Sequence, residues 1–300
     1  MAGYAREVSN EQNLRGAAWM TLGMLGYVVN DAFVKKTVED LELFQTIFIR
    51  GLLLVVFITL IARARGDHQR LRMLRDRRVG ARIGLEAIGT CFFLLALSNL
   101  ALADMTAVLQ LVPLAVTFAA ARLLREQVDW IRVATVLTGF VGVLFVVQPG
   151  SDGSSPWFLA AFAVVVLVTI RELITKKISA EIPSLVIALG TGLVITLMGG
   201  VVSIFEGWQS IEAKHLLLLA TAAGFLSVGY IASVNAVRVG DMSFTAPFRY
   251  SILLFAIVLQ IIVFGEVPDA MSLIGSGIVG AAGLFSLTRE RAVLATVRRG

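Results

Sequence analysis

Long apolar runs separated by short polar connections dominate the chain. A transmembrane helix needs roughly 20 mostly apolar residues, and these runs have about that length. Connections as short as "ALADMT" and "REQVDW" require antiparallel neighbours. The pattern therefore predicts ten membrane-spanning helices, at residues 14–35, 43–62, 83–102, 105–124, 130–148, 156–177, 184–205, 214–237, 242–264 and 270–288.

Composition supports this interpretation. The chain has 300 residues, of which 57% are hydrophobic and 16% charged, and its mean hydropathy is +0.84. Soluble domains carry about 45–50% apolar and about 25% charged residues. The predicted fold class is an all-α polytopic membrane protein.

The distribution of positive charge predicts the orientation. A net charge of +5 would suit nucleic acid, but the arginines crowd into short connections such as residues 63–82. If the N-terminus is cytoplasmic, 21 of the 26 Lys and Arg residues lie on the cytoplasmic side and three on the other. By the positive-inside rule, we expect both termini in the cytoplasm. We expect the chain to lie in the lipid of the inner membrane. Because the arginines lie in short connections between apolar runs, we expect no nucleic-acid partner.

The two halves of the chain resemble one another in sequence. Four segments recur in order at offsets of 137 to 141 residues: "NDAFVKK" and "RELITKK", "DMT" and "DMS", "EQVD" and "EVPD", "GFVG" and "GAAG". A unit of five helices has an odd number, so its second copy must cross the membrane in the opposite sense. The sequence thus predicts two inverted five-helix repeats, residues 1–150 and 151–300, as in many secondary transporters.

The acidic turn before the last helix of each half carries a family resemblance. With "LLREQVDWIRVATVLTGFVGVLF" and "VFGEVPDAMSLIGSGIVGAAGLF", the chain resembles the EamA-type branch of the drug/metabolite transporter superfamily over nearly its whole length. The segments "NLRGAAWMTLGMLGYVVNDAFVK" and "APFRYS" resemble a branch that includes riboflavin and S-adenosylmethionine importers. The resemblance implies a mid-membrane substrate cavity lined mainly by helices 1, 3, 4, 6, 8 and 9, with helices 5 and 10 at the periphery.

The expected function is secondary active transport of a small organic metabolite by alternating access, with riboflavin-like vitamin uptake as the sharpest form. The alternatives are an exporter of amino acids or drugs with the same fold, an S-adenosylmethionine importer and, more remotely, an integral membrane enzyme. A homodimer is left open.

Charged residues inside the predicted spans indicate function, because charge in a bilayer is costly unless it is paired. Asp31 and Arg50 lie towards the outer end, and Glu172 and Arg249 towards the cytoplasmic end. We expect Arg249 to form an inner cluster with Glu172 or Glu86, and Asp31 and Arg50 to form its outer counterpart. Each cluster would close the cavity on its own side as a gate. The alternatives are fixed structural pairs, snorkelling of Arg249 to the headgroups, or substrate contact by Arg249.

Other polar, aromatic and proline residues in the spans are candidates for substrate binding. They are Asn30, Asn99, Gln110, Pro113, Tyr230, Asn235, Phe248 and Arg249. Pro113 and Pro247 predict kinks in helices 4 and 9, because proline lacks a backbone donor.

The motifs of other protein classes are missing from the sequence. No histidine or cysteine pair has metal-ligand spacing, and neither G-x-x-x-x-G-K-[ST] nor G-x-S-x-G occurs. We therefore expect no metal, no cofactor and no catalytic residues.

Overall fold

The computed structural model describes residues 10–65, 73–123, 130–148, 155–175, 178–179, 182–239 and 245–297. Its helices confirm the predicted all-α fold, and the described residues contain no strand. The helices are α1 (Asn10–Thr37), α2 (Leu43–Arg65), α3 (Arg77–Asn99), α4 (Leu102–Leu109), α5 (Leu111–Leu123), α6 (Trp130–Val147), α7 (Trp157–Thr175), α8 (Ser184–Glu206), α9 (Ala213–Val239), η2 (Ala246–Tyr250), α11 (Ser251–Leu259), η3 (Gln260–Phe264) and α12 (Ala270–Val297).

The fourth predicted span is broken into α4 and α5 at Gln110. Pro113 explains the position of the break. It cannot donate to the carbonyl of Leu109, four residues earlier, and its ring would clash with that group in a continuous helix. Accordingly, α4 ends at Leu109.

The ninth span is also irregular. It begins as the 3₁₀ segment η2, continues as α11 and ends as the π-helical segment η3. Gln260, the first residue of η3, is buried, and its side-chain oxygen accepts from the backbone amide of Ala103 at 2.8 Å. Ala103 lies in the first turn of α4, where helix amides have no partner within their own helix.

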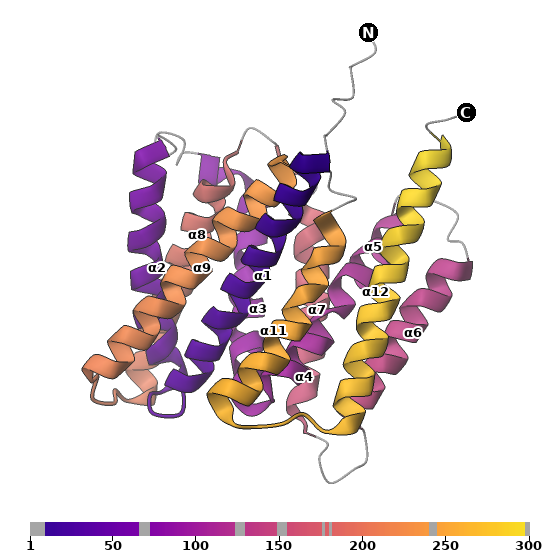
Figure 1. Cartoon of the computed structure of the whole chain (residues 1–300). Coiled ribbons are helices and arrows are strands. Elements are labelled where there is room, and N and C mark those ends of the chain that lie inside the picture. The colour runs from indigo at the N-terminus through magenta and orange to yellow at the C-terminus, as the bar shows by residue number, and fades with distance from the viewer. Residues whose placement is uncertain are drawn as a thin grey trace.

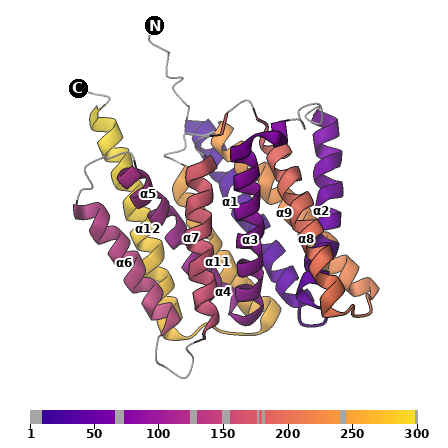
Figure 2. The same cartoon turned by 180° about the vertical axis from the view of Figure 1, so that it is seen from behind.

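The helices form one bundle in which α6 and α12 lie together at one edge and α2 lies at the other (Figure 1). The view from behind shows α7 and α3 side by side in the middle (Figure 2). The most extensive helix contacts are α1 with α9, α2 with α8, α6 with α12, and α3 with α7, while α4 packs against α11. The first residue of α1 and the last of α12 lie at the same end of the bundle (Figure 1).

Glycines allow the closest of these contacts. A Cβ atom on Gly26 of α1 would lie 2.7 Å from the carbonyl oxygen of Phe225 on α9. A Cβ atom on Gly142 of α6 would lie 2.9 Å from the carbonyl oxygen of Gly275 on α12. Small residues let helix backbones approach in membranes, where burial of apolar surface does not drive helices together.

The outer surface of the bundle is apolar. Among the described residues, five helices are long and apolar enough to cross a membrane, and four further apolar helices are shorter. Large apolar side chains point outwards on several of them, for example Leu159 (75% exposed), Leu217 (70%) and Ile262 (74%). Such a surface suits lipid, and the chain is a multi-pass membrane protein.

Candidate functional site

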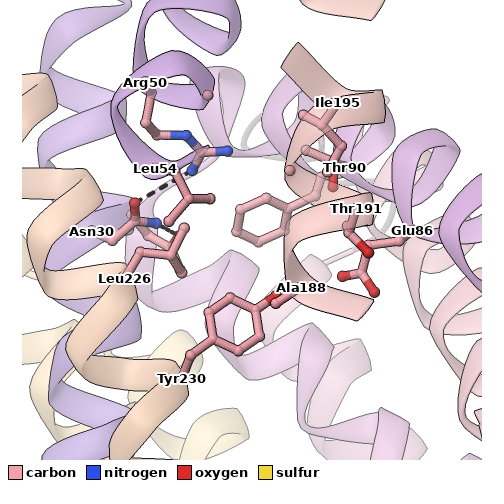
Figure 3. A pocket seen from close by; sticks show the side chains of 14 residues that line it. Asn30, Arg50, Leu54, Glu86, Thr90, Ala188, Thr191, Ile195, Leu226 and Tyr230 are labelled. Atoms are coloured by element: carbon pink, nitrogen blue, oxygen red, sulfur yellow. Dashed lines mark hydrogen bonds between the residues drawn. The ribbon is translucent and has the colours of Figure 1, made fainter. Parts of the chain in front are cut away.

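A cavity of about 140 Å³ lies inside the bundle. Helices α1, α2, α3, α8 and α9 line it, which are the first, second, third, seventh and eighth of the predicted spans. The family resemblance implies spans 1, 3, 4, 6, 8 and 9 instead. Figure 3 shows Arg50 and Asn30 on one wall, Glu86 and Thr191 on another, and the ring of Tyr230 between them. The lining residues are Asn30, Asp31, Arg50, Gly51, Leu54, Glu86, Thr90, Phe93, Ala188, Thr191, Gly192, Ile195, Leu226 and Tyr230.

The first charged cluster consists of Asn30 and Asp31 on α1 and Arg50 on α2. Asn30 bridges the other two: its amide nitrogen donates to Asp31 Oδ1 at 2.9 Å, and its oxygen accepts from Arg50 Nη1 at 3.3 Å. Asn30 and Arg50 are buried, at 2% and 7% exposed. We call these three residues the Arg50 cluster.

The second charged cluster consists of Glu86 and Arg82 on α3 and of Arg171 and Glu172 on α7. Arg171 Nη1 donates to Glu86 Oε1 at 2.6 Å, and its Nη2 donates to Glu172 Oε1 at 2.5 Å. Arg82 lies 3.5 Å from the second oxygen of Glu86. The Arg171 and Glu86 side chains are 18% and 15% exposed, whereas Glu172 is 40% exposed. We call these four residues the Glu86 cluster.

Two threonines extend the Glu86 cluster. Arg82 Nε donates to Thr175 at 3.2 Å, and its Nη1 lies 3.4 Å from the hydroxyl of Thr191 on the cavity wall. The guanidinium of Arg82 therefore connects α3 to α7 and α8 beside the cavity.

Aromatic side chains give the cavity an apolar part. Tyr230 and Phe93 line it, and the ring of Tyr27 packs edge-on against Tyr230 with ring centroids 5.9 Å apart. A surface that combines aromatic rings with a few polar groups is typical of small-molecule sites.

The end of the bundle where α1 joins α2 is held by polar contacts to the α8–α9 connection. Gln45 and Gln209 exchange two hydrogen bonds, of 2.9 and 3.0 Å. Asp40, between α1 and α2, lies 3.1 Å from Lys214 Nζ and 3.2 Å from His215 Nε2. Hydrogen bonds from Lys214 and His215 lower the pKa of Asp40 below its ordinary value. These contacts connect the two halves of the chain.

Of the predicted gating residues, Asp31 and Arg50 come together, with Asn30 between them. Glu172 pairs with Arg171 instead of Arg249. Arg249 is exposed and forms no ion pair with any residue that the structure describes. The expected pairing of Arg249 with Glu172 or Glu86 is therefore not present in this conformation.

Of the predicted substrate-binding residues, Asn30 and Tyr230 line the cavity. Asn99 is exposed and donates to the carbonyl of Leu95, one turn earlier on its own helix. Gln110 is buried at the break between α4 and α5. The others that do not line this cavity are Pro113, Asn235, Phe248 and Arg249.

Glu86 is predicted only as an alternative partner of Arg249, and it contacts Arg171 and Arg82 instead. Arg171 and Thr191 are not among the predicted site residues. The internal repeat contained a signal for both of them. Arg171 lies 141 residues after Asn30, and Thr191 lies 141 residues after Arg50. Both therefore occupy positions that match members of the Arg50 cluster.

The described residues contain no group of three or more His, Cys, Asp or Glu side chains able to hold a metal ion.

Comparisons with known proteins relate the chain to membrane transporters. Residues 14–148 match the EamA-like transporter family. An S-adenosylmethionine uptake transporter of Rickettsia prowazekii (strain Madrid E) is 23% identical over 285 residues, covering 93% of this chain and 94% of that protein. A riboflavin transporter of Vibrio cholerae serotype O1 is 26% identical over 270 residues, covering 89% and 90%. A crystal structure with 17% identity has a TM-score of 0.65 and covers 92% of this chain and 98% of that one, which shows a common fold.

Proposed function

We propose that the chain is an EamA-type transporter of a small metabolite and moves its substrate by alternating access between two inverted repeats, residues 1–150 and 151–300. The cavity carries this proposal. Polar and charged side chains converge on it from five helices whose outer surfaces are apolar. Such residues inside membrane spans mark substrate pathways in transporters.

The helix contacts support the inverted repeat. Among the ten predicted spans, α1 is the first, α3 the third, α7 the sixth and α9 the eighth. If spans 1 to 5 correspond to spans 6 to 10, the contact of α1 with α9 requires an equivalent contact of α7 with α3. Both are among the most extensive in the bundle. The contacts of α2 with α8, α4 with α11 and α6 with α12 each join corresponding helices. The proposed boundary near residue 150 lies outside the described residues, as do Glu126 and Asp241 of the repeated segments.

The proposed orientation places both termini on the cytoplasmic side of the inner membrane. Its support is the excess of Lys and Arg on that side, 21 against three. The common end of α1 and α12 agrees with an even number of crossings. In this orientation the Gln45–Gln209 and Asp40–Lys214 contacts lie on the outer face.

We propose that the two charged clusters act in gating. Asp31 and Glu172 occupy matching positions in the two repeats, and each belongs to one of the clusters. Buried ion pairs gain little net stability, because desolvation offsets their attraction. Clusters of this kind suit a contact that must form and break in each transport cycle.

For the substrate, the relatives suggest riboflavin-like vitamins or S-adenosylmethionine, and export of amino acids or drugs is the alternative. Tyr230 and Phe93, which line the cavity, support a substrate with a flat ring. An enzymatic role has no support in the site, and a homodimer stays a prediction.

Uptake into proteoliposomes tests the proposal. We expect saturable uptake of riboflavin, followed by its fluorescence, or of radiolabelled S-adenosylmethionine. Glu172→Gln should change the rate and leave the amount of folded protein unchanged, since Glu172 is partly exposed. Arg249→Leu tests whether Arg249 takes part in the gate. Full transport by this variant would exclude Arg249 from the gate. Absence of uptake of either compound by folded protein would refute the vitamin and S-adenosylmethionine assignments.

A further inference from the structure

Arg50 is a buried cation with unused hydrogen-bond donors. It is 7% exposed, and its guanidinium group points into the cavity (Figure 3). Its one hydrogen bond to a described residue joins Nη1 to Asn30 at the long distance of 3.3 Å. Arg50 Nε is fully buried and has no hydrogen-bond partner among the described residues.

This arrangement is costly for the protein alone. A guanidinium group has five N–H donors, and buried donors without acceptors are destabilising. Asp31 does not supply the missing acceptor, because Asn30 lies between its carboxylate and Arg50. The donors left over, Nε–H and Nη2–H, lie on one edge of the guanidinium plane. That edge matches the two oxygens of a carboxylate.

The opposite wall does not compete for the same group. Glu86 is the acidic residue there, and Arg171 and Arg82 neutralise it at 2.6 and 3.5 Å. An anionic group that enters the cavity therefore finds its free charged donors on Arg50.

We propose that Arg50 determines specificity by binding a carboxylate of the substrate through its guanidinium group. This inference rests on the proposed function, since it assigns the residue that selects the transported molecule. The substrate class is then a metabolite with an amino-acid-like carboxylate. Of the two compounds carried by the relatives, S-adenosylmethionine has a carboxylate and riboflavin has none.

A structural role for Arg50 leads to a different expectation. If Arg50 serves only as the positive charge beside Asp31, a lysine can replace it without an effect on ligand selection. Arg50→Lys keeps the charge and removes the two-donor edge, so it separates the two roles.

The experiment measures equilibrium binding by titration calorimetry on the purified full chain in lipid nanodiscs. The ligands are S-adenosylmethionine and its decarboxylated analogue. We expect the wild type to prefer S-adenosylmethionine by about ten- to hundredfold, the range of charge-assisted hydrogen bonds. In Arg50→Lys the preference should fall to about one- to threefold with an unchanged unfolding midpoint. Arg63→Lys, an exposed change on the same helix, should keep the wild-type preference.

Three results would overturn the assignment: equal affinity of the wild type for both ligands, an unchanged preference in Arg50→Lys, or a lowered unfolding midpoint of this variant without ligand. Proteoliposome uptake of S-adenosylmethionine tests the proposed function separately. Carboxylate-dependent binding without uptake would refute transport and support Arg50. Uptake without carboxylate preference, or uptake of riboflavin alone, would support transport and refute Arg50, and absence of both binding and uptake would refute both.

Discussion

The Glu86 cluster permits a quantitative prediction, because its two glutamates share Arg171 but differ in burial. Glu86 is 15% exposed and lies between Arg171 and Arg82, whereas Glu172 is 40% exposed and contacts Arg171 alone in this cluster. Replacement of either by glutamine keeps the side-chain size and removes the charge. The difference between the two variants therefore reports the combined effect of burial and of the second arginine partner.

Removal of one partner of a buried ion pair costs about 3–5 kcal/mol, since the other charge stays buried without compensation. In Glu86→Gln, Arg171 keeps its contact with Glu172, so we expect a loss near the lower limit, about 3 kcal/mol. Exposed ion pairs contribute about 0–1 kcal/mol, so Glu172→Gln should lose less than about 1 kcal/mol.

The assay is the free energy of unfolding from denaturant titration in detergent micelles without substrate. A double-mutant cycle with Arg171→Gln should give a larger coupling energy for Glu86 than for Glu172. A loss below about 1 kcal/mol for Glu86→Gln, or equal losses for both variants, would refute the interpretation that this partly buried ion pair holds α3 and α7 together.

Two further predictions concern packing and a helix cap. Gly26→Ala should destabilise the protein by about 1–3 kcal/mol in the same titration, because its Cβ would meet the carbonyl of Phe225. Gly224→Ala is the control: a Cβ atom there would have no neighbouring atom within 4 Å, so this change should be neutral or slightly stabilising. Asp269 accepts from the backbone amide of Ser272 at 2.9 Å at the start of α12, and this bond lowers the pKa of Asp269. Asp269→Ala should therefore lower the free energy of unfolding by about 0.5–2 kcal/mol at pH 7. This difference from wild type should shrink as the pH falls below the ordinary aspartate pKa and through the lowered pKa of Asp269. Wild type then loses the stabilisation by the ionised cap, which the variant lacks at every pH. A difference that stays constant with pH would contradict the capping role.

The sequence was sufficient to predict the spans, because length and hydropathy set which segments can cross a bilayer. Local chemistry also predicted the break caused by Pro113. The π-helical segment η3 was not predictable, since the side chain of Gln260 reaches a backbone amide 157 residues away along the chain.

The site was predicted in part for a similar reason. A charge deep in a span requires a partner, and this requirement brought Asp31 and Arg50 together in the prediction. Arg171 lies near the end of α7, where its sequence position does not distinguish a surface charge from a buried one. Its burial depends on the packing of α3 against α7, which the sequence of either helix does not specify.

The packing of the bundle also has a consequence for synthesis of the protein. The main partner of α1 is α9, that of α2 is α8, and that of α3 is α7, so each early helix packs on one made much later. The backbone amide of Ala103 likewise finds its acceptor on Gln260. The helices made first must therefore stay inserted in the bilayer without their final neighbours until the ribosome has completed the rest of the chain.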